Sequence, residues 1–130
     1  MPVPLEYLVD HARQRLTIIG RDPVDVPDEL AWLERQLADG AWAYGTLDDL
    51  RLVTWNPTSE EVRRILRRIR TLSATHGPRG PVAIVATPPL FDRARTYAAS
   101  LDALVGHVVE VFRSLADAEH WLDERQAAQP

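Results

Sequence analysis

The stretch from Gly80 to Phe112, GPVAIVATPPLFDRARTYAASLDALVGHVVEVF, decides the fold of this 130-residue chain. Its first part, residues 81–87, is a short apolar run without polar alternation, which is typical of a strand covered on both faces. From Leu90 the apolar residues recur at intervals of three and four, which predicts a helix that ends at Gly106. Residues 107–112 then return to a β-rich run. The stretch therefore predicts a βαβ crossover, right-handed by default.

Apolar periodicity and turn residues place the other elements along the chain. Two short apolar segments open it as an antiparallel hairpin, and the later strands alternate with helices. The expected strands are 5–9, 16–19 and 44–49, and the expected helices are 25–40, 60–75 and 114–122, with a frayed tail over 125–130. With the crossover, the order β-β-α-β-α-β-α-β-α predicts one α/β domain with a core over about 5–122. Its sheet is expected to be mixed, largely parallel and five-stranded, packed with four helices.

The composition excludes several classes of site. The formal net charge is −4, which gives no general electrostatic reason to bind nucleic acid. Cysteine and lysine are both absent, which excludes thiolate, Schiff-base and P-loop lysine chemistry. No apolar run is long enough to insert into a membrane, and the first residues lack the pattern of a secretory signal, so a cytoplasmic protein is expected.

The element order and several segments of the chain resemble the STAS superfamily and, within it, the bacterial SpoIIAA-like (STAS/SEC14-like) proteins. The likeness lies in residues 49–54, 82–86, 90–97 and 109–122. This resemblance implies a non-enzymatic regulatory module, similar to the anti-sigma-factor antagonists, that binds another protein or pairs with itself as a homodimer.

The antagonists of that superfamily are phosphorylated on a serine at the start of their second helix, and Ser59, next to Thr58, lies at the matching position. Pro57 replaces the aspartate of the family pattern, and Glu60 and Glu61 replace a Gly-Leu pair. A phosphate on Ser59 would gain from the helix dipole but would be repelled by the two glutamates. These departures predict a regulator without the usual phosphoswitch, in which Thr58 or Ser59 only caps the helix.

A dense group of basic residues covers the polar side of the helix predicted over 60–75. On a helix it faces away from the apolar stripe that begins at Val62. Guanidinium groups in such a cluster suit an acidic partner, a phosphate or nucleic acid. Nucleic acid is disfavoured, because no aromatic residues are interleaved for stacking and the rest of the chain is acidic. The alternative is a solvated surface, softened by a pair between Glu60 and Arg64. The members of the cluster are Arg63, Arg64, Arg67, Arg68 and Arg70.

The loops after the strands supply a second candidate site. In open α/β sheets, ligands bind beyond the carboxyl ends of the strands. The residues expected there are Trp55, Asn56, Thr87 and Arg113. They suit a lipid or nucleotide, which makes small-molecule binding the alternative function, although Trp55 and Trp42 equally suit the core. No catalytic residue, metal ligand or cofactor is predicted, because neither a G-x-S-x-G turn nor histidines at ligand spacing occur.

Overall fold

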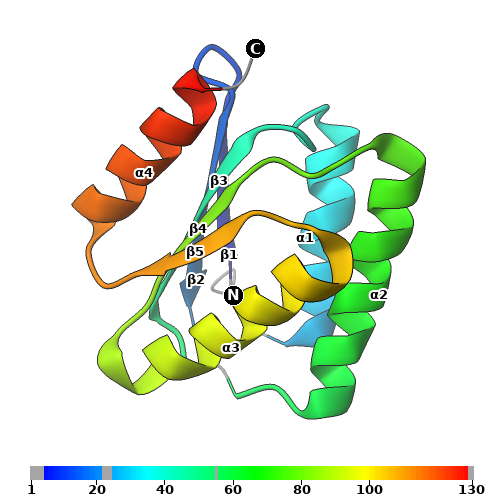
Figure 1. The fold of residues 1–130 in the computed structure, drawn as a ribbon, viewed down its shortest axis with the longest axis vertical. Helices are drawn as coiled ribbons and strands as arrows, with labels where there is room; N and C mark the ends of the chain where they lie inside the picture. Colours follow the sequence, from blue (N-terminus) through cyan, green and yellow to red (C-terminus); the bar gives the residue numbers. More distant parts are fainter. Residues whose placement is uncertain (1–4, 22–24, 55, 129–130) are drawn as a thin grey trace.

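The structure is a computed structural model that describes residues 5–21, 25–54 and 56–128. In these residues an opening hairpin is followed by alternating helices and strands (Figure 1). In chain order the elements are β1 (Leu5–Asp10), β2 (Arg15–Arg21), α1 (Val26–Ala38), β3 (Gly45–Leu52), α2 (Ser59–His76), β4 (Val82–Val85), α3 (Pro88–Val105), β5 (Val109–Phe112) and α4 (Leu115–Ala127).

The strands form one sheet whose order, β1-β2-β3-β4-β5, equals their order in the chain. β1 pairs with β2 antiparallel, and the other neighbours are parallel. The predicted α/β class, element order and mixed sheet are thereby confirmed. β3 continues to Leu52, beyond the predicted end at Asp49, because pairing with β2 resumes after a register shift. Within the sheet, Asp48 lies between Ile18 and Ile84.

The helices form a layer on each side of the sheet. α1, α2 and α3 cover one face, and α4 covers the other (Figure 1). Each of the first three helices joins neighbouring parallel strands, and crossovers of constant hand between neighbours place their helices on one face. α4 follows the last strand and packs mainly on β3 and β4. The core on its side consists of Leu47, Ala83, Val85, Ala118 and Leu122.

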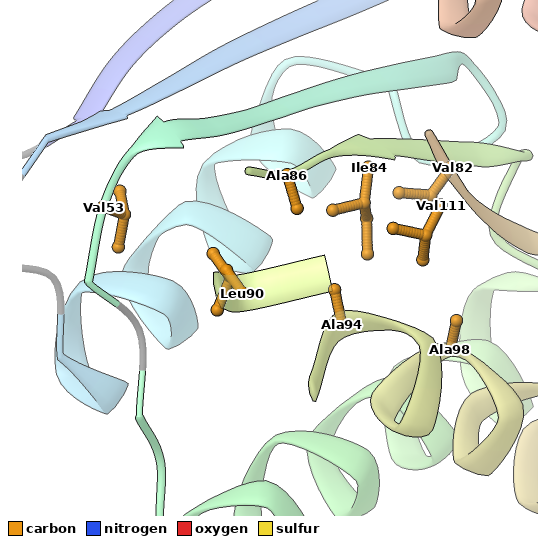
Figure 2. Close-up of a cluster of buried hydrophobic side chains, with 8 residues drawn as sticks. All are labelled: Val53, Val82, Ile84, Ala86, Leu90, Ala94, Ala98 and Val111. Atoms are coloured by element: carbon orange, nitrogen blue, oxygen red, sulfur yellow. The ribbon is translucent and has the colours of Figure 1, made fainter. Parts of the chain in front are cut away.

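The crossover that the sequence predicts forms β4, α3 and β5. All four residues of β4 are buried. α3 begins at Pro88, so the prolines that end the strand also occupy the first helical turn, where a missing N–H costs no hydrogen bond. Gly106, with φ +67°, caps the other end in the left-handed conformation that favours glycine. Figure 2 shows the core where these elements meet, formed by Val53, Val82, Ile84, Ala86, Leu90, Ala94, Ala98 and Val111.

Gly80 lies where two backbone segments approach each other closely. Its N–H donates to the Trp42 carbonyl at 3.0 Å, just before β4 begins. A Cβ atom at this position would overlap the carbonyl oxygens of Ala43 and Tyr44. Because these obstacles are backbone atoms, no side-chain rearrangement can relieve the overlap, and only glycine fits.

The prediction of a frayed tail from Arg125 is wrong for residues 125–127, which continue α4. Gln126 connects this last turn to the start of β2 through hydrogen bonds. Its Nε2 donates to the Gln14 carbonyl at 2.7 Å, and its Oε1 accepts from Arg15 Nε at 2.8 Å. These hydrogen bonds to a distant part of the chain hold the last turn of α4, which would otherwise be expected to fray as chain ends usually do.

Candidate functional site

The arginine surface is defined here as the outward side of α2 that carries Arg63, Arg64, Arg67, Arg68 and Arg70. Its side chains are largely solvent-exposed: 65% for Arg63, 68% for Arg67 and 41% for Arg68. The inward side of α2 buries Ile65, Leu66, Ile69 and Leu72. The helix is therefore amphipathic, as its periodicity predicts, and holds its charges on the side opposite the core.

Glu60 neutralises part of this surface, but not at the predicted position. Its carboxylate accepts from Arg67 Nη2 at 3.3 Å and lies 4.0 Å from Arg63 Nη1. The predicted Glu60–Arg64 pair is therefore wrong. Residues 60, 63 and 67 follow one another along one edge of the helix, whereas Arg64 lies on the adjacent edge.

Arg68 joins the arginine surface to α1. Its Nε donates to Glu34 Oε1 at 2.8 Å, and its Nη2 pairs with the same oxygen. Within the described part of the chain, neither Arg64 nor Arg70 forms an ion pair. A shallow hollow lies between the two helices and is lined by Leu30, Arg64, Arg67, Arg68 and Thr71.

Thr58 is the residue that caps α2. Its hydroxyl accepts from the Glu61 N–H at 3.1 Å, and the Glu61 carboxylate accepts from the Thr58 N–H at 2.9 Å, which completes a capping box. Ser59 is the first helical residue and is exposed. The structure therefore assigns the cap to Thr58 and leaves the Ser59 hydroxyl out of it.

The predicted pocket residues at the strand ends are brought together only in part. Thr87 and Arg113 follow β4 and β5, which are neighbours in the sheet. The Arg113 guanidinium lies 4.5 Å from the centre of the Phe91 ring and is exposed. Asn56 is exposed before α2, and Trp55 lies outside the described residues.

A cavity that the sequence analysis did not predict lies between the sheet and the layer of α1, α2 and α3. Its volume is about 50 Å³. We call it the interior cavity. Most of its wall is apolar, with residues such as Ile18, Ile69 and Leu101. Polar and titratable side chains from α1, α3, β3 and the loops before β4 and β5 line the rest: Glu29, Trp32, Asp48, Arg79, Tyr97 and His107.

Arg79 brings a buried positive charge to the interior cavity. The residue is 9% exposed, and its guanidinium carbon lies 4.8 Å and 5.6 Å from the ring centres of Trp32 and Trp42. Its Nε donates to Gln36 Oε1 at 3.1 Å, whereas Nη2 has no hydrogen-bond partner among the described residues. Burial lowers the pKa of Arg79 to about 10, so the group is cationic at neutral pH.

His107 brings a hydrogen-bond acceptor. Its Nε2 lies 3.1 Å from the Gly80 carbonyl oxygen, which can only accept, so Nε2 carries the proton. Burial and the nearby charge of Arg79 lower the pKa of His107 to about 3, so the ring is neutral. Nδ1 is therefore an acceptor, and among the described residues it has no partner.

Asp48 adds a half-buried carboxyl group to the interior cavity. Burial raises its pKa to about 7, although Arg79 opposes the rise. Burial and the charge of Glu29 likewise raise the pKa of Tyr97, so its phenol stays protonated. Groups with shifted pKa values that gather in one cavity from separate elements are typical of functional sites.

Sequence reasoning missed this cavity because its residues are far apart in the chain and form no motif. Arg79 lies in the turn after α2 and His107 in the turn after α3, where charged residues are ordinarily solvated. One signal was available: Asp48 is a charged residue inside a strand, and a pleated strand that places Asp49 on one face places Asp48 on the other.

Within the described ranges, no helix combines the length and apolar character that crossing a membrane requires. The same residues contain no group of three or more His, Asp or Glu side chains able to hold a metal ion. His11 instead contacts the Tyr44 hydroxyl at 2.8 Å, and His120 contacts Glu124 at 2.8 Å.

Comparisons with known proteins give one partial similarity. The probable tape measure protein of Escherichia phage Mu is 28% identical to this chain over 102 residues, which cover 75% of this chain. The chain spans about 15% of the length of that relative. No protein-family profile matches the sequence, and no solved structure matches it significantly.

Proposed function

We propose that the chain is a non-enzymatic interaction module that binds an acidic segment of another protein through the arginine surface of α2. The observation that carries the proposal is the charge imbalance there. Two carboxylates, of Glu60 and Glu34, face the arginines of this surface, and Arg64 and Arg70 form no ion pair among the described residues.

An unpaired guanidinium on a rigid helix is well suited to carboxylates. It offers parallel N–H donors that match both oxygens of an Asp or Glu side chain. Leu30, which lines the hollow beside these arginines, adds one apolar side chain against which the methylene groups of an acidic segment would pack. A partner of this kind is favoured over nucleic acid, because the chain as a whole has a net charge of −4.

The resemblance to the SpoIIAA-like proteins supports the same class of function. Regulators of that group act by binding a protein, and by element order α2 would correspond to the helix that begins at their phosphorylated serine. Ser59 is exposed at the matching position, but Glu60 stands next to it. The proposed module therefore binds its partner without control by phosphorylation of Ser59. The similarity to a segment of a tape measure protein has no part in this proposal.

A charge-reversal experiment tests the proposal. The double variant Arg64→Glu/Arg70→Glu changes the two unpaired arginines, and Arg95→Glu/Arg125→Glu makes the same change of charge on α3 and α4. The unmodified chain and both variants are used as bait in an extract of the native host, and every captured protein is then purified and titrated directly. We expect the first variant to lose at least about tenfold in affinity and the control to change little.

Three outcomes distinguish the proposal from its alternatives. An equal loss of affinity in both double variants means that the net charge of the chain, and not the arginine surface, attracts the partner. A captured protein that binds the first variant unchanged refutes the proposed surface. Concentration-dependent dimerisation that only the Arg64→Glu/Arg70→Glu variant loses would make a second copy of the chain the partner, which light scattering detects.

A further inference from the structure

The interior cavity contains hydrogen-bonding groups whose capacity the chain does not use. Arg79 Nη2, Trp32 Nε1 and His107 Nδ1 are all buried and without hydrogen-bond partners among the described residues. Buried polar atoms in folded proteins nearly always have a partner, because an unpaired one retains the cost of its lost hydration. Three such atoms around one cavity indicate a polar ligand.

We propose that the interior cavity binds a small hydroxycarboxylate of the size of glycolate, held by Arg79, Trp32 and His107. Arg79 and Trp32 supply N–H donors for the carboxylate oxygens. His107 supplies an acceptor, because its Nε2 proton is committed to the Gly80 carbonyl at 3.1 Å. A ligand that forms hydrogen bonds with Arg79 Nη2, Trp32 Nε1 and His107 Nδ1 must have acceptor oxygens at one end and a donor hydroxyl group at the other.

The surroundings hold these groups in fixed orientations. The Arg79 guanidinium packs over the rings of Trp32 and Trp42, and its Nε donates a hydrogen bond to Gln36. Because the plane of the Arg79 guanidinium and its Nε edge are both fixed, its Nη2 cannot turn away to solvent. Such preorganisation lowers the entropy cost of binding a small ligand.

The volume of the cavity limits the size of the ligand. One water molecule needs about 10–15 Å³ of a cavity measured in this way. A volume of about 50 Å³ therefore suits a ligand of only a few non-hydrogen atoms. Acetate and glycolate are of this size, and lactate carries an additional methyl group that the apolar wall would have to accommodate.

Asp48 makes the binding dependent on pH. Its carboxyl group competes with the ligand for the positive charge of Arg79, and burial places its pKa at about 7. The other charged or titratable groups that line the cavity with it are Glu29 on α1, Tyr97 on α3 and the Arg79–His107 pair, whereas its neighbour Asp49 lies on the opposite face of β3 and acts only through its charge. Because ionised Asp48 must regain a proton before the anion binds, affinity falls about tenfold for each pH unit above 7.

The test is an NMR titration of the full-length, ¹⁵N-labelled chain at constant ionic strength, about one pH unit below the Asp48 pKa. The indole N–H signal of Trp32, assigned with the Trp32→Phe variant, reports occupancy of the cavity. We expect glycolate to shift this signal saturably, acetate to bind about tenfold more weakly for lack of the hydroxyl, and lactate to bind more weakly still. Inorganic phosphate and chloride are expected to cause no saturable shift.

Variants separate the site from a general salt effect. Arg79→Gln is expected to abolish the shift, and Asp48→Asn to bind glycolate with an affinity that no longer varies between neutral and mildly alkaline pH. If Arg79→Gln does not fold, the ligand series on the unmodified chain and on Asp48→Asn still decides the question. If the cavity holds only water, glycolate causes no saturable shift, and this result would overturn the proposal. A saturable shift with phosphate, or one with lactate as strong as with glycolate, would also overturn it. The outcome is independent of the arginine surface on the opposite side of α2.

Discussion

The substitution Asp48→Asn is expected to stabilise the protein at alkaline pH and to leave its stability nearly unchanged in acid. The reason is the difference between the folded and unfolded states of one carboxyl group. Burial raises the pKa of Asp48 from its ordinary value of 3.8 to about 7. Between these two pH values the folded chain holds a proton that the unfolded chain has lost, so rising pH favours unfolding.

The size of the effect follows from the pKa difference. A rise of about three pH units, at about 1.4 kcal/mol for each, lowers the free energy of unfolding by about 4 kcal/mol once Asp48 is fully ionised. Asparagine has almost the same shape as the protonated carboxyl group and does not titrate. The variant is therefore expected to exceed the unmodified protein by up to about 4 kcal/mol above pH 8, and by little near pH 4.

His107 gives the stability of the unmodified protein a dependence on pH that opposes the one from Asp48. Burial lowers its pKa from 6.5 to about 3, so between these values the unfolded chain binds a proton that the folded chain excludes. Its contribution to stability therefore grows as the pH rises through that window, while the contribution of Asp48 falls. The two slopes nearly cancel between about pH 4 and pH 6.5. In Asp48→Asn only the histidine slope is left, and stability should increase by about 1.4 kcal/mol per pH unit there.

Urea denaturation followed by tryptophan fluorescence measures these quantities, in carboxylate-free buffers across the range from about pH 4 to pH 8.5. Asp49→Asn is the matched control on the same strand. Asp49 is buried, but hydrogen bonds from Arg51 outweigh that burial and lower its pKa, so this variant should be less stable at neutral pH. A stability difference between Asp48→Asn and the unmodified protein that is the same at pH 5 and pH 8 would refute the reasoning.

Three further substitutions test the fold. Gly80→Ala should destabilise the protein by about 2–3 kcal/mol or more in thermal or urea unfolding, because its Cβ meets backbone carbonyls, and a loss below about 1 kcal/mol would contradict the close approach. Thr58→Ala should cost about 1 kcal/mol by removing the helix cap, whereas equal costs for Thr58→Ala and Ser59→Ala would show that the cap is assigned wrongly. Gln126→Ala should lower the free energy of unfolding by about 1–3 kcal/mol, because buried Arg15 loses an acceptor, and should speed amide exchange in the last turn of α4. Unchanged amide exchange would mean that this contact does not hold the end of the helix.

The element order could be predicted because local signals and tertiary packing agree over most of this chain. The βαβ crossover is an example: a fully buried strand, two prolines suited to a first helical turn and a glycine that ends α3 all indicate the same structure. The end of α4 could not be predicted in the same way. Arg125 to Ala127 are helical because Gln126 contacts Gln14 and Arg15, more than a hundred residues earlier, and no local pattern contains that information.

The two candidate sites differ in the same respect. The arginine surface belongs to a single helix, so the spacing of its residues predicted which side of the helix they share. The structure was needed only for their ion pairs, with Glu60 and with Glu34 on α1. The interior cavity depends on Asp48, Arg79 and His107, which three separate parts of the chain contribute. Their roles arise from burial, and burial is a property of the assembled layers.

The equality of strand order and chain order has a consequence for how the protein folds. Each strand after β1 pairs with the strand that precedes it, so each new strand finds its neighbour already in place and only one hairpin or one helical crossover has to close. The sheet can grow in the order of synthesis, from the β1–β2 hairpin to β5. α4 is the exception, because it returns across the sheet to the beginning of the chain, with Gln126 against Gln14. Its docking is therefore expected to be the last and slowest contact to form, and a nascent chain that ends before residue 115 would expose the apolar face of β3 and β4 that α4 covers.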